Sequence, residues 1–224
     1  FESRFNSMSQ ISGVGDTKGG ALESGLDNSP MYDDVPFDYE RHCMMLADVG
    51  LTSMYVADCA MLADLAGVTQ RAEAAAELQT RADAYSRGLA GLWNDEAGIF
   101  TNLRTDTGEP SLRLSPTNFY ALLTDVPTPE QARRMIDEHF FNEEEFAGEW
   151  ILPSIARNDP AYPEQRYWRG KIWAPMNFLV YLGLAMRGRV LGGVAAPALT
   201  LRRAVSNAVK FDDFSPIFLN CGAV

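Results

Sequence analysis

Two long stretches with helical periodicity follow one another in this 224-residue chain, and they limit the folds open to it. In the first, apolar residues recur at helical spacing over residues 51–65, and Gly67 ends the pattern. In the second, over 69–93, apolar residues come at steps of four and three and form one stripe: Leu78, Ala82, Tyr85, Leu89 and Leu92. Because only a short link separates the two helices, we expect an antiparallel pair.

Further helices are predicted downstream, with long loops between them. Thr128 and Gln131 form a capping box that predicts a helix over about 128–140. Two apolar segments, 173–186 and 195–209, predict two more helices. Helix pairs that alternate with long loops rich in polar and aromatic residues are typical of an all-α toroid, in which the loops at one end line a cleft.

Composition narrows the class of partner. The chain carries 19 Lys+Arg against 30 Asp+Glu, a net charge of −11, which argues against a nucleic acid or an anionic membrane. Three cysteines and two histidines show no metal-ligand spacing, so we expect no metal and no cofactor, and a cytoplasmic location is weakly favoured. The apolar run 172–186 is too short to span a bilayer core of about 30 Å. The acidic run 143–145 is predicted to be a solvated face.

The first segment that indicates chemistry is Glu23-Ser-Gly-Leu-Asp-Asn-Ser-Pro, residues 23–30. Gly25 and Pro30 make a continuous helix unfavourable, so we expect a shaped loop that carries the Glu23 and Asp27 carboxyl groups. Such a loop can hold a carboxyl group partly away from water, as a general acid requires. The alternative is an Asx turn, in which Asp27 or its neighbour caps the backbone.

The second segment is Tyr-Trp-Arg-Gly-Lys-Ile-Trp-Ala-Pro-Met-Asn, residues 167–177. The flat indole faces of Trp168 and Trp173 suit the C–H face of a sugar ring, and Arg169 can donate hydrogen bonds to hydroxyl groups. This mixture of aromatic platform and fixed donors is what a neutral polyol ligand requires. The alternative is that both Trp side chains belong to the core and that Arg169 is a structural ion-pair partner.

Together the two segments resemble the acid-bearing and sugar-site motifs of glycoside hydrolase family 63, and lean towards its bacterial mannosylglycerate hydrolases and processing α-glucosidases. The resemblance covers about residues 21–186 and includes the intervening segments 48–51, 92–100 and 152–162. It implies an (α/α)6 toroid that hydrolyses α-glycosidic bonds of a small carbohydrate with inversion and without a metal. On the matching positions Asp27 becomes the general acid. The implied substrate-binding or supporting residues are Glu23, Asn28, Tyr167, Trp168, Arg169, Trp173 and Asn177.

The chain departs from the family pattern at its C-terminal end. The family carries its catalytic base, a Glu, downstream of the Tyr-Trp-Arg-Gly motif, whereas residues 187–224 contain no Glu and only two carboxylates, Asp212 and Asp213. We also count about six or seven helices of the roughly twelve in such a toroid, with one short β-hairpin over 98–108. The expected organisation is therefore a loop over 1–20 and a partial catalytic domain over 21–224. The alternative bases within the chain are Glu149, Asp159 and Asp33.

Three other readings remain. A carbohydrate-binding scaffold protein would keep the Trp and Arg platform without turnover. A helical interaction domain would use both motifs only for folding. Within the hydrolases, a trehalase is the nearest rival, because trehalases share a similar Glu-Ser-Gly-x-Asp run.

Overall fold

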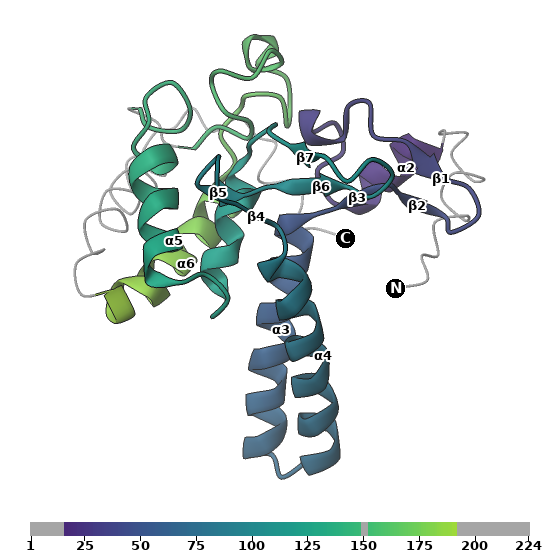
Figure 1. Ribbon diagram of the computed structural model, residues 1–224, viewed down its shortest axis with the longest axis vertical. Coiled ribbons are helices and arrows are strands. Elements are labelled where there is room, and N and C mark those ends of the chain that lie inside the picture. The colour runs from purple at the N-terminus through teal and green to yellow at the C-terminus, as the bar shows by residue number, and fades with distance from the viewer. Residues whose placement is uncertain (1–15, 149–151, 192–224) are drawn as a thin grey trace, which may run out of the picture.

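The computed structural model describes residues 16–148 and 152–191 (Figure 1). The helices are α2 (Asp16–Glu23), η1 (Pro30–Tyr32), α3 (Val49–Val68), α4 (Ala72–Ala90), η2 (Pro116–Leu123), α5 (Pro129–Arg134), η3 (Met135–Phe140), η4 (Tyr162–Glu164) and α6 (Ala174–Leu191). The strands are β1 (Phe37–Asp38), β2 (Cys43–Met44), β3 (Leu46–Ala47), β4 (Trp93–Asn94), β5 (Ile99–Phe100), β6 (Asn102–Arg104) and β7 (Pro110–Ser111). The described chain is therefore mainly helical, with short strands.

Helices α3 and α4 form an antiparallel hairpin that projects from a body of loops and shorter helices (Figure 1). The periodicity predicted both helices, and the structure confirms them within a few residues at each end. Tyr55 of α3 and Tyr85 of α4 pack edge to face across the hairpin, with ring centroids 4.6 Å apart. By length and composition alone α3 could cross a membrane, but the core helix of a globular protein meets the same criterion.

The body is built around η2, a 3-10 helix of eight residues that are all buried. Ser115 and Asn118 form a capping box at its start, and Pro116 occupies its first position. Helices α3 and α6 pack against η2 from either side. The sequence did not predict this element, because it is only eight residues long and packs against α3 and α6, which lie far from it in the chain.

The short strands join the body at three places. β1 pairs with β2, β4 pairs with β5, and β6 lies between β3 and β7, all antiparallel. The single hairpin predicted over 98–108 is therefore wrong as drawn, because β5 pairs with β4 whereas β6 pairs with β3 and β7. β6 also reaches the start of α3, because the Asn102 Oδ1 accepts a hydrogen bond of 2.8 Å from the Val49 N–H.

The capping box of Thr128 and Gln131 is confirmed at the start of α5, and a π-helical turn, η3, continues that helix to Phe140. Residues 16–20 were predicted to be loop but belong to α2, so the loop prediction was wrong there. The helix predicted over 195–209 lies outside the described residues.

The prediction of a solvated face over 143–145 is wrong for Glu145, which is buried against His139. The Glu145 carboxylate lies 2.6 Å from the His139 Nδ1, and the Ala97 carbonyl oxygen lies 2.7 Å from its Nε2. Burial alone would lower the pKa of His139, but the hydrogen bonds to Glu145 and to the Ala97 carbonyl outweigh it, and the pKa is raised. The pair ties η3 to the turn that follows it.

This pair predicts a pH dependence of folding. A histidine whose pKa is raised in the folded state stabilises it fully below the unfolded-state pKa, about 6.5, and this contribution is lost as the pH rises through the folded-state pKa. Urea unfolding of the chain should therefore show a free energy that falls as the pH rises above about 6.5. His139→Gln should remove this fall. A variant that keeps the same pH dependence would show that another group causes it.

Candidate active site

The acid-bearing segment forms a loop, as predicted, between α2 and η1. Gly25 ends α2 with a φ of +76°, a conformation that glycine adopts without strain. Two serines satisfy the local backbone, because the Ser24 Oγ accepts from the Leu26 N–H and the Ser29 Oγ accepts from the Met31 N–H. The alternative of an Asx turn by Asn28 is not observed, since its Oδ1 accepts instead from a residue 140 positions away.

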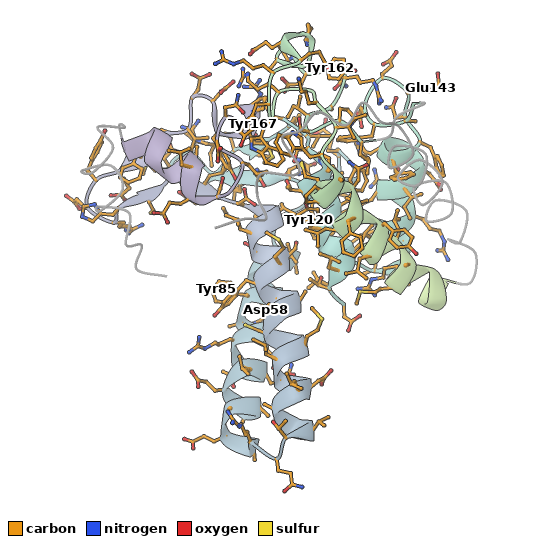
Figure 2. The ribbon with its side chains drawn as sticks, turned by 180° about the vertical axis from the view of Figure 1, so that it is seen from behind. Asp58, Tyr85, Tyr120, Glu143, Tyr162 and Tyr167 are labelled. Atoms are coloured by element: carbon orange, nitrogen blue, oxygen red, sulfur yellow. The ribbon has the colours of Figure 1, made fainter. Side chains whose placement is uncertain are left out.

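That distant residue is Trp168, whose backbone N–H donates to the Asn28 Oδ1 over 3.0 Å. The Arg169 guanidinium also donates to the Asn28 carbonyl oxygen over 3.3 Å. The structure therefore brings the two predicted motifs together, directly beside Asp27 in the chain. Figure 2 shows Tyr162 and Tyr167 in the loop-rich part of the body, away from Asp58 and Tyr85 on the α3–α4 hairpin.

Asp27 is half-buried. Among residues 16–148 and 152–191 its carboxyl group has neither a hydrogen-bond nor an ion-pair partner. A carboxyl group that is held in a shaped loop and left without a protein partner can exchange a proton with a bound molecule.

The far end of the acid loop is anchored to α3. The Tyr32 hydroxyl donates to the Asp48 Oδ2 over 3.1 Å, and the Asp48 Oδ1 caps α3 by accepting from the Leu51 N–H. Burial raises the pKa of Asp48, although these hydrogen bonds oppose the shift. Burial and the neighbouring Asp48 also raise the pKa of Tyr32. The segment that follows Asp27 is thus held by part-buried contacts at Asn28 and by a buried contact at Tyr32.

Three aromatic residues of the second motif form one cluster. The Trp168 and Trp173 rings are stacked with centroids 3.9 Å apart, and Tyr167 meets both of them edge to face. The Trp173 Nε1 donates to the Tyr167 carbonyl oxygen over 2.9 Å. Trp168 is only 8% exposed, whereas Tyr167 is 39% exposed. For Trp168 the geometry favours the core reading, and the accessible aromatic surface lies on Tyr167 and Trp173.

Arg169 differs from the expectation that its guanidinium is available to sugar hydroxyl groups. Its five N–H groups donate to the Glu164 and Asp33 carboxylates and to the Asn28 carbonyl oxygen. Since a guanidinium has five N–H donors, this set uses all of them. The geometry therefore favours the alternative, a structural ion-pair partner, and identifies Asp33 and Glu164 as its unforeseen partners.

Asn177 and Gly170 hold the loop of the second motif against the neighbouring segment 152–154. Asn177 is 2% exposed, and its Nδ2 donates to the Leu152 and Trp173 carbonyl oxygens, both over 3.0 Å. The Gly170 N–H donates to the Ser154 Oγ over 3.0 Å. Asn177 thus fixes the start of α6 and the neighbouring loop, which is a supporting position.

Gly170→Ala tests how tightly this loop is packed. The φ of Gly170 is +107°, and an added Cβ would lie 2.6 Å from both the Tyr162 carbonyl oxygen and the Gln165 Nε2. We expect a loss of about 1–3 kcal/mol from backbone strain and about 1–3 kcal/mol from overlap. The control is Gly108→Ala, with a φ of +76° and nothing within 4 Å of its Cβ in the described structure, which should show only the strain. Equal losses in urea unfolding would contradict a close-packed loop.

Glu23 lies apart from the aromatic cluster. It is exposed at the end of α2 and lines a hollow of about 940 Å³, whose walls come mainly from α3, α6 and the segment around β2 and β3. Of the eight predicted site residues, Glu23 alone lines this hollow. The structure therefore brings seven of the predicted residues together, whereas Glu23 lies at the separate hollow.

The alternative bases that fall within the described residues are engaged with arginines. Asp159 accepts two hydrogen bonds from Arg113, of 2.9 and 2.8 Å, and Asp33 accepts from both Arg113 and Arg169. Burial would raise the pKa of Asp159, but hydrogen bonds from Arg113 and the Ala161 N–H, with the charges of Arg113 and Arg169, together outweigh it and the pKa is lowered. A lowered pKa makes a weaker base. Glu149, Asp212 and Asp213 lie outside the described residues.

Comparison with known families agrees with the motif resemblance. Residues 18–214 match the mannosylglycerate hydrolase MGH1-like glycoside hydrolase domain, and the chain belongs to this family of glycoside hydrolases. A mannosylglycerate hydrolase of Thermus thermophilus is 33% identical over 99 residues, 43% of this chain and 23% of that protein. A cytosolic neutral trehalase of Kluyveromyces lactis is 25% identical over 181 residues, 75% of this chain and 23% of that protein.

Solved structures agree at the level of the fold. The family 63 mannosylglycerate hydrolase of Thermus thermophilus in complex with Tris is 27% identical, with a TM-score of 0.62 over 71% of this chain and 36% of that chain. The chain thus spans about a quarter of the length of the curated relatives above. The resemblance to glycoside hydrolase family 63 is confirmed.

Proposed function

We propose that the whole protein hydrolyses an α-linked glucoside or mannoside, such as a mannosylglycerate-like substrate, with Asp27 as general acid. The observation that carries the proposal is the contact between the two motifs through Asn28 and Trp168, beside the half-buried residue Asp27. Family membership and the mannosylglycerate hydrolase relatives support the same class of reaction.

The proposed reaction inverts the anomeric carbon. Asp27 gives its proton to the glycosidic oxygen as the bond to the anomeric carbon breaks, and a water molecule attacks that carbon from the opposite face. A second carboxylate, roughly 6.5–9.5 Å from the acid, takes the proton from this water. We propose that this base comes from a part of the protein beyond these 224 residues. The absence of Glu after residue 186 and the arginine contacts of Asp33 and Asp159 support this.

In the proposed site, Tyr167 and Trp173 offer aromatic surface to the sugar, while Asn28, Trp168, Arg169 and Asn177 hold the two loops in place. Glu23, at the end of α2, is proposed to support the site from its periphery without contacting the aromatic cluster. We further propose that the described helices form part of an (α/α)6 toroid and that the protein is cytoplasmic. Its family 63 neighbours and its cytosolic trehalase relatives support these points.

The trehalase relatives favour a second candidate, hydrolysis of trehalose. The test is a panel of substrates offered to the purified whole protein: mannosylglycerate, trehalose, an aryl α-glucoside, an aryl α-mannoside and the matching β-glycosides. We expect free hexose from one of the α-linked compounds and from none of the β-linked ones. Binding without hydrolysis of any compound would favour the carbohydrate-binding scaffold and contradict the proposal.

A further inference from the structure

The guanidinium of Arg169 connects three segments of the chain. Glu164 receives bonds of 2.7 and 2.8 Å, and Asp33 receives bonds of 3.0 and 2.9 Å, so both carboxylates are held in a bidentate manner. The bond of 3.3 Å to the Asn28 carbonyl oxygen adds the residue next to Asp27. Bidentate pairs fix geometry as well as adding energy.

Asp33 is also the centre of a longer chain of alternating charges. Arg113 donates to the Asp33 Oδ2 over 2.9 Å and is itself held in a bidentate manner by Asp159. The order is therefore Asp159, Arg113, Asp33, Arg169 and Glu164, with each charge next to its opposite. The side chains of Asp159 and Arg169 are 4% and 15% exposed and are shielded from solvent, whereas the Asp33 and Glu164 side chains are 36% and 47% exposed.

We propose that Asp33 and Arg169 are positioning residues that clamp the Asp27 loop against the aromatic loop, and that they promote turnover without touching the substrate. This inference rests on the proposed function of Asp27. The clamp holds the segment that follows Asp27 at two points, at the Asn28 carbonyl and at the Asp33 carboxylate. The Trp168 N–H adds a contact to the side chain of Asn28. A movement of the Arg169 guanidinium therefore moves the backbone next to Asp27.

Misplacement of a catalytic group by about 1 Å can cost about 10²-fold in rate. Asp33→Asn removes the negative charge between the two arginines, and Arg169→Lys keeps the positive charge but removes the planar fork. In the whole protein we expect each variant to lower kcat about 10-fold or more with KM within about threefold. The loss should be larger for glycosides with poor leaving groups, because these depend most on the acid.

The control is Glu138→Gln. Arg134 of α5 holds Glu138 of η3 in a bidentate manner, over 2.6 and 3.1 Å, outside the two motifs. This variant loses the same kind of ion pair and should keep its kcat and its leaving-group dependence. Thermal unfolding of all variants shows which of them are folded, and kcat is expressed per folded molecule.

The possible results separate the inference from the function on which it rests. If Asp27→Asn shows a loss that depends on the leaving group while Asp33→Asn and Arg169→Lys do not, Asp27 is the acid and the clamp is refuted. If Arg169→Lys mainly raises KM, the guanidinium contacts the substrate and the positioning role is wrong. If Asp27→Asn has normal turnover, Asp27 is not the general acid. The proposed function is then refuted, and so is the clamp that depends on it.

Discussion

Asp27→Asn is expected to lower kcat towards an unactivated α-glycoside by about 10²–10⁴-fold, the usual contribution of general acid catalysis. An amide cannot give a proton to the leaving oxygen, but it fills the same space in the loop. Substrate affinity should therefore stay within about threefold of the wild-type value. Steady-state kinetics of the whole protein, with binding measured separately by calorimetry, gives both quantities.

A matched control is Asp34→Asn, the same change on a neighbouring carboxylate. Asp34 is exposed, and its φ of +62° is a conformation that Asn adopts readily. Its variant should turn over substrate at the wild-type rate. Equal rates for Asp27→Asn and wild type would remove Asp27 from the chemistry, and equal losses in both variants would indicate a general effect of charge.

Phe119→Ala is expected to cost about 3–5 kcal/mol of unfolding free energy, as removal of a fully buried ring usually does. Phe119 lies on η2 with no exposed surface, and its ring meets Phe146 at 5.2 Å and Phe140 at 6.1 Å, edge to face in both cases. Because α3 and α6 both pack on η2, the cavity would lie at the centre of the body. Equilibrium urea unfolding measures the loss.

The control for this prediction is Phe141→Ala. The Phe141 ring also meets Phe140, at 5.2 Å, but it is 44% exposed. We expect a loss of about 1 kcal/mol or less, because the surrounding water fills the space of the removed ring. A loss at Phe141 as large as the loss at Phe119 would contradict the position of the core around η2.

Local signals predicted the elements whose stabilising contacts are themselves local. The α3–α4 hairpin follows from apolar periodicity, and α5 follows from the capping box of Thr128 and Gln131. The helix η2 was missed because it is only eight residues long and its packing partners, α3 and α6, are distant in the sequence. Glu145 was wrongly predicted to lie on the surface, because its sequence position does not show that its carboxylate contacts the buried His139.

In the candidate site, too, local motifs could be predicted whereas contacts between distant residues could not. The family resemblance indicated that the loop of Asp27 and the loop of Trp168 belong together, and the contact through Asn28 brings them together. The engagement of Arg169 could not be predicted, because Asp33 is 136 residues away and because a carboxylate, whether Asp33 or the nearby Glu164, and a sugar hydroxyl satisfy the same donors. Only the positions of the acceptors distinguish the two.

The most direct test of the central claim, that Asp27 is the acid of a glycosidase, is a series of aryl α-glycosides whose phenol leaving groups differ in pKa. We predict that Asp27→Asn hydrolyses glycosides of the most acidic phenols at nearly the wild-type rate, since these leave without a proton. Its deficit should grow steadily as the phenol pKa rises. A deficit of the same size for every leaving group, or no deficit at all, would contradict this role of Asp27.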